Sequence, residues 1–183
     1  LNKLSKYKES KIIWLTGMFG TGKSFYSKYL YEKYKSLNKK IQILDGDTIR
    51  DKYDTPLGYS KEDIFKNNMF IADICDKNYK NYDVTIVSVI SPYESIRNKI
   101  KEKFKNNIYF IFVKADIESL KARDTKKLYF KADNNEIKDL IGYSNSSKYE
   151  KPINPDLILN TSECSKPDDN YNILDSFFKL TNE

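Results

Sequence analysis

The fold of this chain is decided by the stretch Lys11-Ile12-Ile13-Trp14-Leu15-Thr16-Gly17-Met18-Phe19-Gly20-Thr21-Gly22-Lys23-Ser24. Its first six residues are largely apolar, which is typical of a buried parallel strand. Its last eight match the Walker A pattern, a glycine-rich loop that joins a strand to a helix. Backbone N–H groups of such a loop wrap phosphates, and the following helix adds the positive end of its dipole. We therefore predict a phosphate-binding loop at residues 17–24. The alternative is a tight strand–helix turn that binds no nucleotide.

Strand-like and helix-like segments alternate along the rest of the chain. Further strands are expected at residues 41–44, 84–90, 108–113 and 157–159, and helices at residues 24–35, 61–79, 92–104 and 117–123 and after Pro167. This alternation predicts an α/β fold of three layers, a parallel sheet flanked by helices as in P-loop NTPases. We expect residues 1–183 to form a single domain of this kind.

Local signals also predict where some helices begin and which side they bury. Ser60 and Ser91, the latter followed by Pro92, read as helix N-caps. The helix after the glycine-rich loop should bury one side, formed by Phe25, Tyr29, Leu30 and Tyr34. Residues 124 to about 151 are polar and too long for an ordinary connection, so they form either a functional lid or a disordered segment. We call residues 124–147 of this stretch the lid segment.

Composition excludes several kinds of chemistry. The chain has no histidine and only two cysteines, Cys75 and Cys164, so histidine-based catalysis, disulfide frameworks and four-cysteine zinc sites are ruled out. No apolar run is long enough to span a bilayer, and no signal peptide is evident, so we expect a cytoplasmic protein with no membrane partner. The net charge of +6 suits a lysine-rich solvated surface. A nucleic-acid partner is not expected, because basic residues and aromatics do not gather at one place.

Two scarce residue types are informative. Three of the six glycines fall within residues 17–22, and there are only three arginines, Arg50, Arg97 and Arg123. Where lysine is the default cation, an arginine indicates a need for its planar fork, which binds phosphate or stacks on a ring.

A pair of carboxylates follows the second predicted strand. Asp45 and Asp47 would lie at the edge of a parallel sheet where ligands bind. One can hold magnesium through water while the other accepts a proton from a hydroxyl. The alternative is an acidic turn that caps a helix. Lys23 would reach the outer phosphates of ATP and Ser24 would ligate Mg²⁺. Residues 88–90, at the end of the third predicted strand, carry no acid of the kind a motor-type ATPase uses there, so the sequence favours a small-molecule kinase.

These motifs, taken in order from residue 11 to residue 161, resemble the adenylylsulfate (APS) kinase family. The resemblance rests on residues 13–17, 44–50, 57–60 and 90–93, on the lid pattern Arg123-Asp124-x-Lys126-x-Leu128-Tyr129-x-Lys131-Ala132, and on residues 149–157. The family implies ATP-dependent phosphorylation of the ribose 3′-hydroxyl of a nucleotide, and it suggests a homodimer. It places the catalytic groups at Asp47, Lys23 and Lys126, and the magnesium-holding groups at Ser24 and Asp45.

The resemblance also implies two sets of binding residues. For ATP they are Gly17, Gly20, Thr21, Gly22, Lys23, Ser24, Phe25, Arg123 and Thr161, with Arg123 stacking on adenine. For the small-molecule nucleotide acceptor they are Asp47, Arg50, Tyr59, Ile64, Asn67, Ile90, Ser91, Pro92, Lys126, Leu128 and Leu140.

The chain departs from the family mainly at positions that would recognise the acceptor. Ile64 stands in place of an arginine, Met69 and Phe70 in place of two more, Leu140 in place of a phenylalanine, and Lys127 in place of a lid glycine. Losing these donors and this stacking face favours a different acceptor. Our first expectation is therefore the family's cytidine diphosphoramidate kinase branch, which serves capsule biosynthesis. The alternative is an APS kinase, and the non-enzyme alternative is a nucleotide-binding regulatory module.

Overall fold

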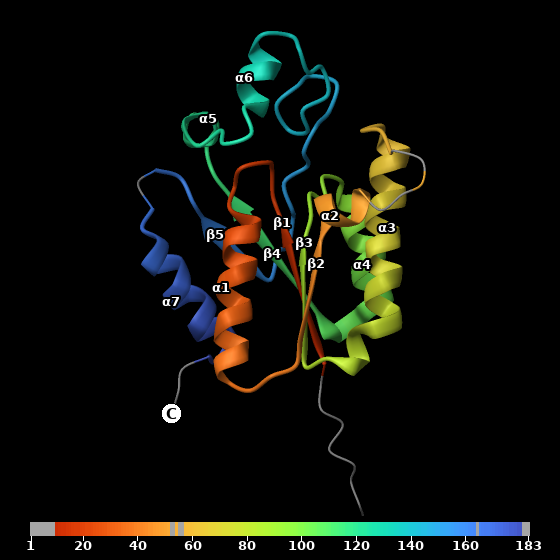
Figure 1. The fold of residues 1–183 in the computed structure, drawn as a ribbon, viewed down its shortest axis with the longest axis vertical. Coiled ribbons are helices and arrows are strands. Elements are labelled where there is room, and N and C mark those ends of the chain that lie inside the picture. The colour runs from red at the N-terminus through yellow and green to blue at the C-terminus, as the bar shows by residue number, and fades with distance from the viewer. Residues whose placement is uncertain (1–9, 52–53, 55–56, 164, 181–183) are drawn as a thin grey trace, which may run out of the picture.

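The computed structural model describes residues 10–51, 54, 57–163 and 165–180. Its centre is a parallel sheet of five strands in the order β2-β3-β1-β4-β5 (Figure 1). The strands are β1 Lys11–Thr16, β2 Ile41–Asp45, β3 Val84–Ser88, β4 Ile108–Lys114 and β5 Leu157–Asn160. The expected α/β fold is confirmed, and the central strand β1 leads directly into the glycine-rich loop.

Helices cover both faces of the sheet, as Figure 1 shows. One face carries α1 Lys23–Ser36 and α7 Pro167–Phe178, and the other carries α3 Lys61–Asn78 and α4 Glu94–Phe104. Successive side chains of a strand point to opposite faces, so β1 contributes to two cores. Ile13 and Leu15 pack with the α1 and α7 side, while Ile12 and Trp14 pack with the α3 and α4 side.

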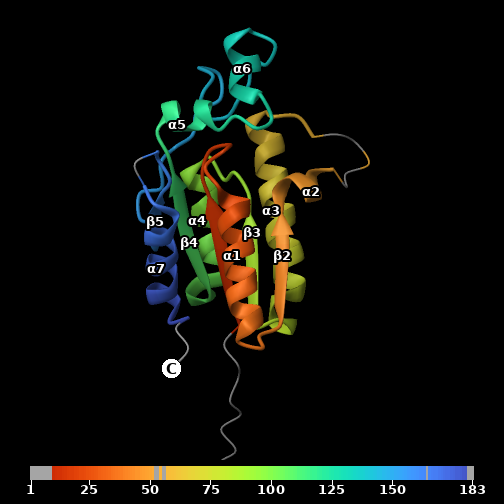
Figure 2. The same ribbon diagram turned by 60° about the vertical axis from the view of Figure 1, so that its left-hand side comes forward.

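The lid segment lies above the carboxyl ends of the strands, which Figures 1 and 2 both show. It follows α5 Ile117–Ala122 and contains a short helix, α6 Leu128–Asp133, that the sequence analysis did not predict. The remaining elements are the short helix α2 Gly46–Arg50 and two 3-10 turns, η1 Tyr79–Asn81 and η2 Lys105–Asn107. Among the residues described, no helix has the length and apolar character needed to cross a membrane.

The two predicted caps have different outcomes. Ser60 does cap α3, because its hydroxyl accepts a hydrogen bond from the Asp63 N–H at 3.1 Å. The prediction for Ser91 is wrong, since α4 begins at Glu94 with Tyr93 as its cap residue. The Ser91 hydroxyl is buried instead, where it accepts from Trp14 Nε1 at 2.9 Å and donates to Asn68 Oδ1 at 2.6 Å. The Ser91 side chain therefore belongs to a buried hydrogen-bond network and does not cap the helix.

Two further expectations are corrected. Strand β3 ends at Ser88, not at residue 90, and the chain then turns toward the ligand edge. The inner face of α1 is formed by Tyr26, Leu30 and Tyr34, while Phe25 is 53% exposed. Phe25 and Tyr29 face α7 instead of the sheet, because both rings stack on Tyr171, with centroids 6.0 and 4.0 Å away.

Arg97 does not bind a ligand as the scarcity of arginine suggested, because its guanidinium group binds other groups of the protein. The side chain is 2% exposed. Its NH1 group donates to the Ser91 carbonyl at 2.5 Å and its NH2 group to the Glu150 carbonyl at 2.8 Å. Nε and NH2 also donate to the Glu94 carboxylate, at 3.0 and 2.5 Å. Arg97 therefore fastens the chain after β3 to the start of α4 and to the segment after the lid.

Candidate active site

A cavity of about 670 Å³ opens at the carboxyl ends of β1, β2 and β3. The glycine-rich loop forms its floor, and residues from α2, from the chain after β3, from the lid segment and from the start of α7 complete its wall. Twelve of the predicted site residues line it: Gly20, Thr21, Gly22, Lys23, Ser24, Phe25, Asp45, Asp47, Ile90, Arg123, Lys126 and Thr161. Residues far apart in the sequence therefore meet around one space of a size that suits nucleotides.

The glycine-rich loop has the close backbone contacts that its glycines allow. A Cβ atom on Gly17 would lie 2.2 Å from the Val113 carbonyl oxygen, and Gly22 has a left-handed φ of +94°. The Lys23 ammonium donates to the carbonyls of Gly17 at 3.0 Å and Met18 at 2.8 Å. Burial lowers the pKa of Lys23 to about 8, an effect that the nearby carboxylates of Asp47 and Asp45 partly oppose. The loop thus holds a cation directly beside the cavity.

The two carboxylates that line the cavity have separate positions. One oxygen of Asp45 accepts from the N–H groups of Asp47 at 3.1 Å and Thr48 at 3.2 Å, which caps α2. Its other oxygen is 3.4 Å from the Ser24 hydroxyl. Asp45 therefore caps a helix, as the alternative interpretation held, and also faces the loop. The Asp47 carboxylate is exposed and lies 3.2 Å from the Lys126 ammonium of the lid segment.

A third group of contacts joins the loop to the other end of the sheet. The Arg123 NH1 group donates to the Thr161 carbonyl at 2.7 Å, and the Thr161 hydroxyl donates to the Thr21 carbonyl at 2.9 Å. Arg123 is thereby held at the rim of the cavity, with the start of α7 nearby. A planar cation in this place can stack on an aromatic base.

Nine predicted site residues do not line this cavity in the structure: Gly17, Arg50, Tyr59, Ile64, Asn67, Ser91, Pro92, Leu128 and Leu140. Ile64 is 1% exposed in the core beneath α3, and Leu140 packs at 8% exposure inside the lid segment. Arg50 donates to the carbonyls of Leu57 and Gly58 and lies over the Tyr59 ring, 4.8 Å from its centre. Contact between these residues and a ligand stays a prediction.

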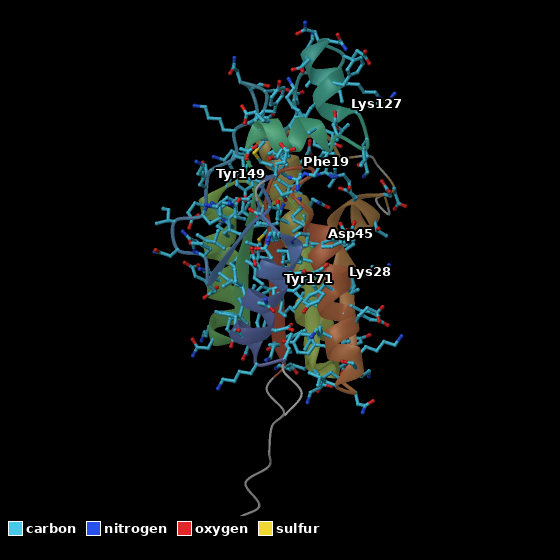
Figure 3. All side chains as sticks on the ribbon, turned by 90° about the vertical axis from the view of Figure 1, so that its left-hand side faces the viewer. Phe19, Lys28, Asp45, Lys127, Tyr149 and Tyr171 are labelled. Carbon is cyan, nitrogen blue, oxygen red and sulfur yellow. The ribbon has the colours of Figure 1, made fainter. Side chains whose placement is uncertain are left out.

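Sequence reasoning missed several residues that line the cavity, namely Phe19, Tyr26, Ser88, Val89, Thr125, Ser165, Pro167 and Asn170. Phe19 and Thr125 stand next to motif residues in the sequence, so their position could have indicated that they line the cavity. Asn170 had none, because it reaches the cavity through α7, where its amide donates to the Tyr26 hydroxyl at 2.8 Å. Figure 3 shows Phe19 below Lys127 and Asp45 further down, toward the middle of the molecule.

A parallel sheet whose central strand runs into a phosphate-binding loop, with a lysine and carboxylates around one cavity, defines a P-loop phosphotransferase. Comparison with known proteins refines this class. Residues 9–160 match the family model described as adenylylsulphate kinase. The chain belongs to this family, whose members transfer a phosphoryl group to a hydroxyl.

Individual relatives agree with this assignment. The chain is 34% identical over 154 residues to a probable adenylyl-sulfate kinase of Archaeoglobus fulgidus, which covers 84% of this chain and 97% of the relative. It is 37% identical over 161 residues to a probable adenylyl-sulfate kinase of Pyrococcus abyssi, with 88% and 90% covered. Its fold is similar to that of the Mycobacterium tuberculosis APS kinase solved with AMPPNP and APS, with a TM-score of 0.80, 24% identity and 93% and 98% covered.

Proposed function

We propose that this chain transfers the γ-phosphoryl group of ATP to the ribose 3′-hydroxyl of adenylyl sulfate. The observation that carries the proposal is that the phosphate-binding loop and the Asp47–Lys126 pair line the same cavity. A phosphoryl group bound by the loop and a hydroxyl beside Asp47 would therefore meet within this cavity. The two relatives compared above are named probable adenylyl-sulfate kinases, which supports adenylyl sulfate as the acceptor.

In this mechanism the protein's residues bind and orient the two substrates, and one of them accepts a proton. The acceptor oxygen attacks the γ-phosphorus, the bond from that phosphorus to the β,γ-bridging oxygen breaks, and ADP leaves. Asp47 takes the proton of the hydroxyl, since its carboxylate is exposed at the cavity. Lys23 and Lys126 neutralise the charge on the transferring group, and the lid segment excludes water.

The residues present fit a magnesium ion. Ser24 Oγ and Asp45 Oδ2 lie 3.4 Å apart at the edge of the cavity, beside the place where phosphates would bind. Mg²⁺ takes oxygen ligands and is held by one or two protein groups, with substrate phosphates and water completing its shell. We expect these two residues to hold it, and the ion to neutralise charge on the phosphates.

Adenylyl sulfate replaces our first expectation, cytidine diphosphoramidate, as the favoured acceptor. The argument for the cytidine compound depended on Ile64 and Leu140 altering the pocket. Neither side chain lines the cavity, because each is buried in an apolar cluster that reaches the cavity through other members, such as Val89 and Phe19. The buried Asn67 Oδ1 has no hydrogen-bond partner among the described residues, but Asn67 does not line the cavity.

The test is ATP consumption with adenylyl sulfate, cytidine diphosphoramidate, CDP or no acceptor. Turnover selective for adenylyl sulfate is expected. Turnover selective for the cytidine compound would overturn the acceptor and leave the kinase mechanism standing. Binding of ATP without turnover on any of them would overturn the proposed reaction and favour a regulatory module. Asp47→Asn protein serves as the background control for contaminating ATPases.

A further inference from the structure

One contact between the lid segment and the glycine-rich loop has no part in the mechanism above. Tyr129, on α6, donates its hydroxyl hydrogen to the backbone carbonyl of Phe19 at 2.7 Å. The side chain is 1% exposed, and burial raises the pKa of its phenol. The hydroxyl therefore stays protonated and remains a donor at any physiological pH. A phenylalanine would keep the ring and lose this donor, so the role of the hydroxyl can be tested apart from that of the ring.

The Phe19 carbonyl controls the orientation of a donor in the loop. In a trans peptide the N–H of the next residue points opposite to the carbonyl, and no cis peptide occurs among the described residues. Fixing the Phe19 carbonyl toward the lid segment thus fixes the Gly20 N–H away from it. Gly20 lines the cavity and has a left-handed φ of +77°. Without an anchor, a glycine peptide can rotate readily, and the phosphate donor would lose its direction.

Three other carbonyls of the loop accept hydrogen bonds from side chains outside the lid segment. Lys23 donates to Gly17 and Met18, and the Thr161 hydroxyl donates to Thr21. Among these four contacts, only the donor to Phe19 comes from the lid segment. The loop is thus anchored on one side by the sheet and on the other by a helix of the lid.

Neighbouring contacts bring the lid segment to the same part of the loop. The Phe19 and Tyr129 ring centroids are 6.4 Å apart, and Lys126 Nζ lies 5.5 Å from the centre of the Phe19 ring. Gly142 packs so closely on Met18 that an added Cβ would come within 2.8 Å of that side chain. Residues 18–20 are therefore covered by the lid from more than one direction.

We propose that Tyr129 is a positioning residue that orients the Gly20 N–H for phosphate binding, so that the lid segment forms part of the phosphate site. This inference rests on the proposed function, since it takes ATP as the ligand of the loop. It has a consequence for regulation of the same site. When the lid segment lifts away, the loop loses this anchor, and by reciprocity phosphate binding favours the docked lid.

The test compares Tyr129→Phe with Tyr143→Phe. Both remove one hydroxyl from a tyrosine of the lid segment, but the Tyr143 hydroxyl bonds to Asp133 and Lys121 within or beside the lid and not to the loop. Dissociation constants are measured for AMPPNP, a non-hydrolysable ATP analogue, and for AMP, which lacks the outer phosphates. We expect Tyr129→Phe to weaken AMPPNP about three- to tenfold, the value of one hydrogen bond, and to leave AMP unchanged. Tyr143→Phe should change neither.

The outcomes separate the two proposals. Wild-type protein that does not bind AMPPNP would refute the proposed function. Wild-type binding with unchanged AMPPNP affinity in Tyr129→Phe, or an equal loss for AMPPNP and AMP, would refute the positioning role alone. A measurement on wild-type protein covers the case in which the variant does not fold. AMPPNP, but not AMP, should slow hydrogen exchange in residues 128–133 by at least about threefold, and equal protection by both ligands would overturn the coupling.

Discussion

Replacing Arg97 by methionine should cost much of the protein's stability. The side chain is 2% exposed, and its guanidinium makes hydrogen bonds to the carbonyls of Ser91 and Glu150 and to the Glu94 carboxylate. Methionine fills similar volume but leaves two carbonyls and a half-buried carboxylate without their partner. Unpaired buried groups cost about 1–3 kcal/mol each, and breaking a buried ion pair costs about 3–5 kcal/mol. Because these terms overlap, we expect the free energy of unfolding to fall by about 3–5 kcal/mol.

Urea unfolding followed by circular dichroism measures this change. The transition midpoint should fall with its slope unchanged, and Tm should drop by about 6–20 °C, since each kcal/mol lowers Tm by about 2–4 °C in a chain of this size. The control is Lys99→Met, an exposed charge on the same helix with one cation–π contact to Phe65, which should cost at most about 1 kcal/mol. A loss below about 1 kcal/mol for Arg97→Met would refute the reasoning.

The same variant should also affect the acceptor more than ATP. Arg97 holds the Ser91 carbonyl, and the preceding residue, Ile90, lines the cavity. Releasing that carbonyl should let this part of the wall move while the glycine-rich loop stays in place. At a temperature where the variant is folded, we expect KM for adenylyl sulfate to rise several-fold and KM for ATP to change little. Equal changes in both values would contradict this.

Three further outcomes follow from the site. Asp47→Asn should lower kcat about 10²–10⁴-fold with little change in ATP affinity, measured by coupled assay and calorimetry; near-normal turnover would remove Asp47 from the proton transfer. The pKa of Lys23 is lowered to about 8 in the ligand-free protein, so its positive charge is present below that pH and lost above it. The affinity for AMPPNP should therefore fall by up to about tenfold per pH unit above 8, and constant affinity from pH 7 to 9.5 would argue against a role for this ammonium. Gly142 has a φ of +83°, and Gly142→Ala adds a Cβ that contacts Met18. The free energy of unfolding in urea should therefore fall by about 1–2 kcal/mol. An unchanged midpoint would show that the backbone and Met18 accommodate the methyl group at no cost.

Short-range sequence patterns were enough to predict most of the fold. The apolar run of β1, the glycine spacing of residues 17–24 and the Ser60 cap each involve neighbours within a few residues, so composition and spacing suffice to predict them. The alternation of strands and helices then leaves few topologies open, because crossovers between parallel strands are right-handed and connections are short. The same signals predicted that Lys23, Ser24 and Asp45 would gather at one edge of the sheet.

Tertiary structure decided what each polar group does with its hydrogen bonds. Ser91 and Arg97 looked like a helix cap and a ligand-binding arginine. Both instead form hydrogen bonds in a buried network whose partners are up to 77 residues apart in the sequence. The Asp47–Lys126 pair spans 79 residues, and the Tyr129–Phe19 bond spans 110. No periodicity encodes such pairs. A buried donor or acceptor must find a partner wherever packing brings one, and only the folded chain determines which partner that is.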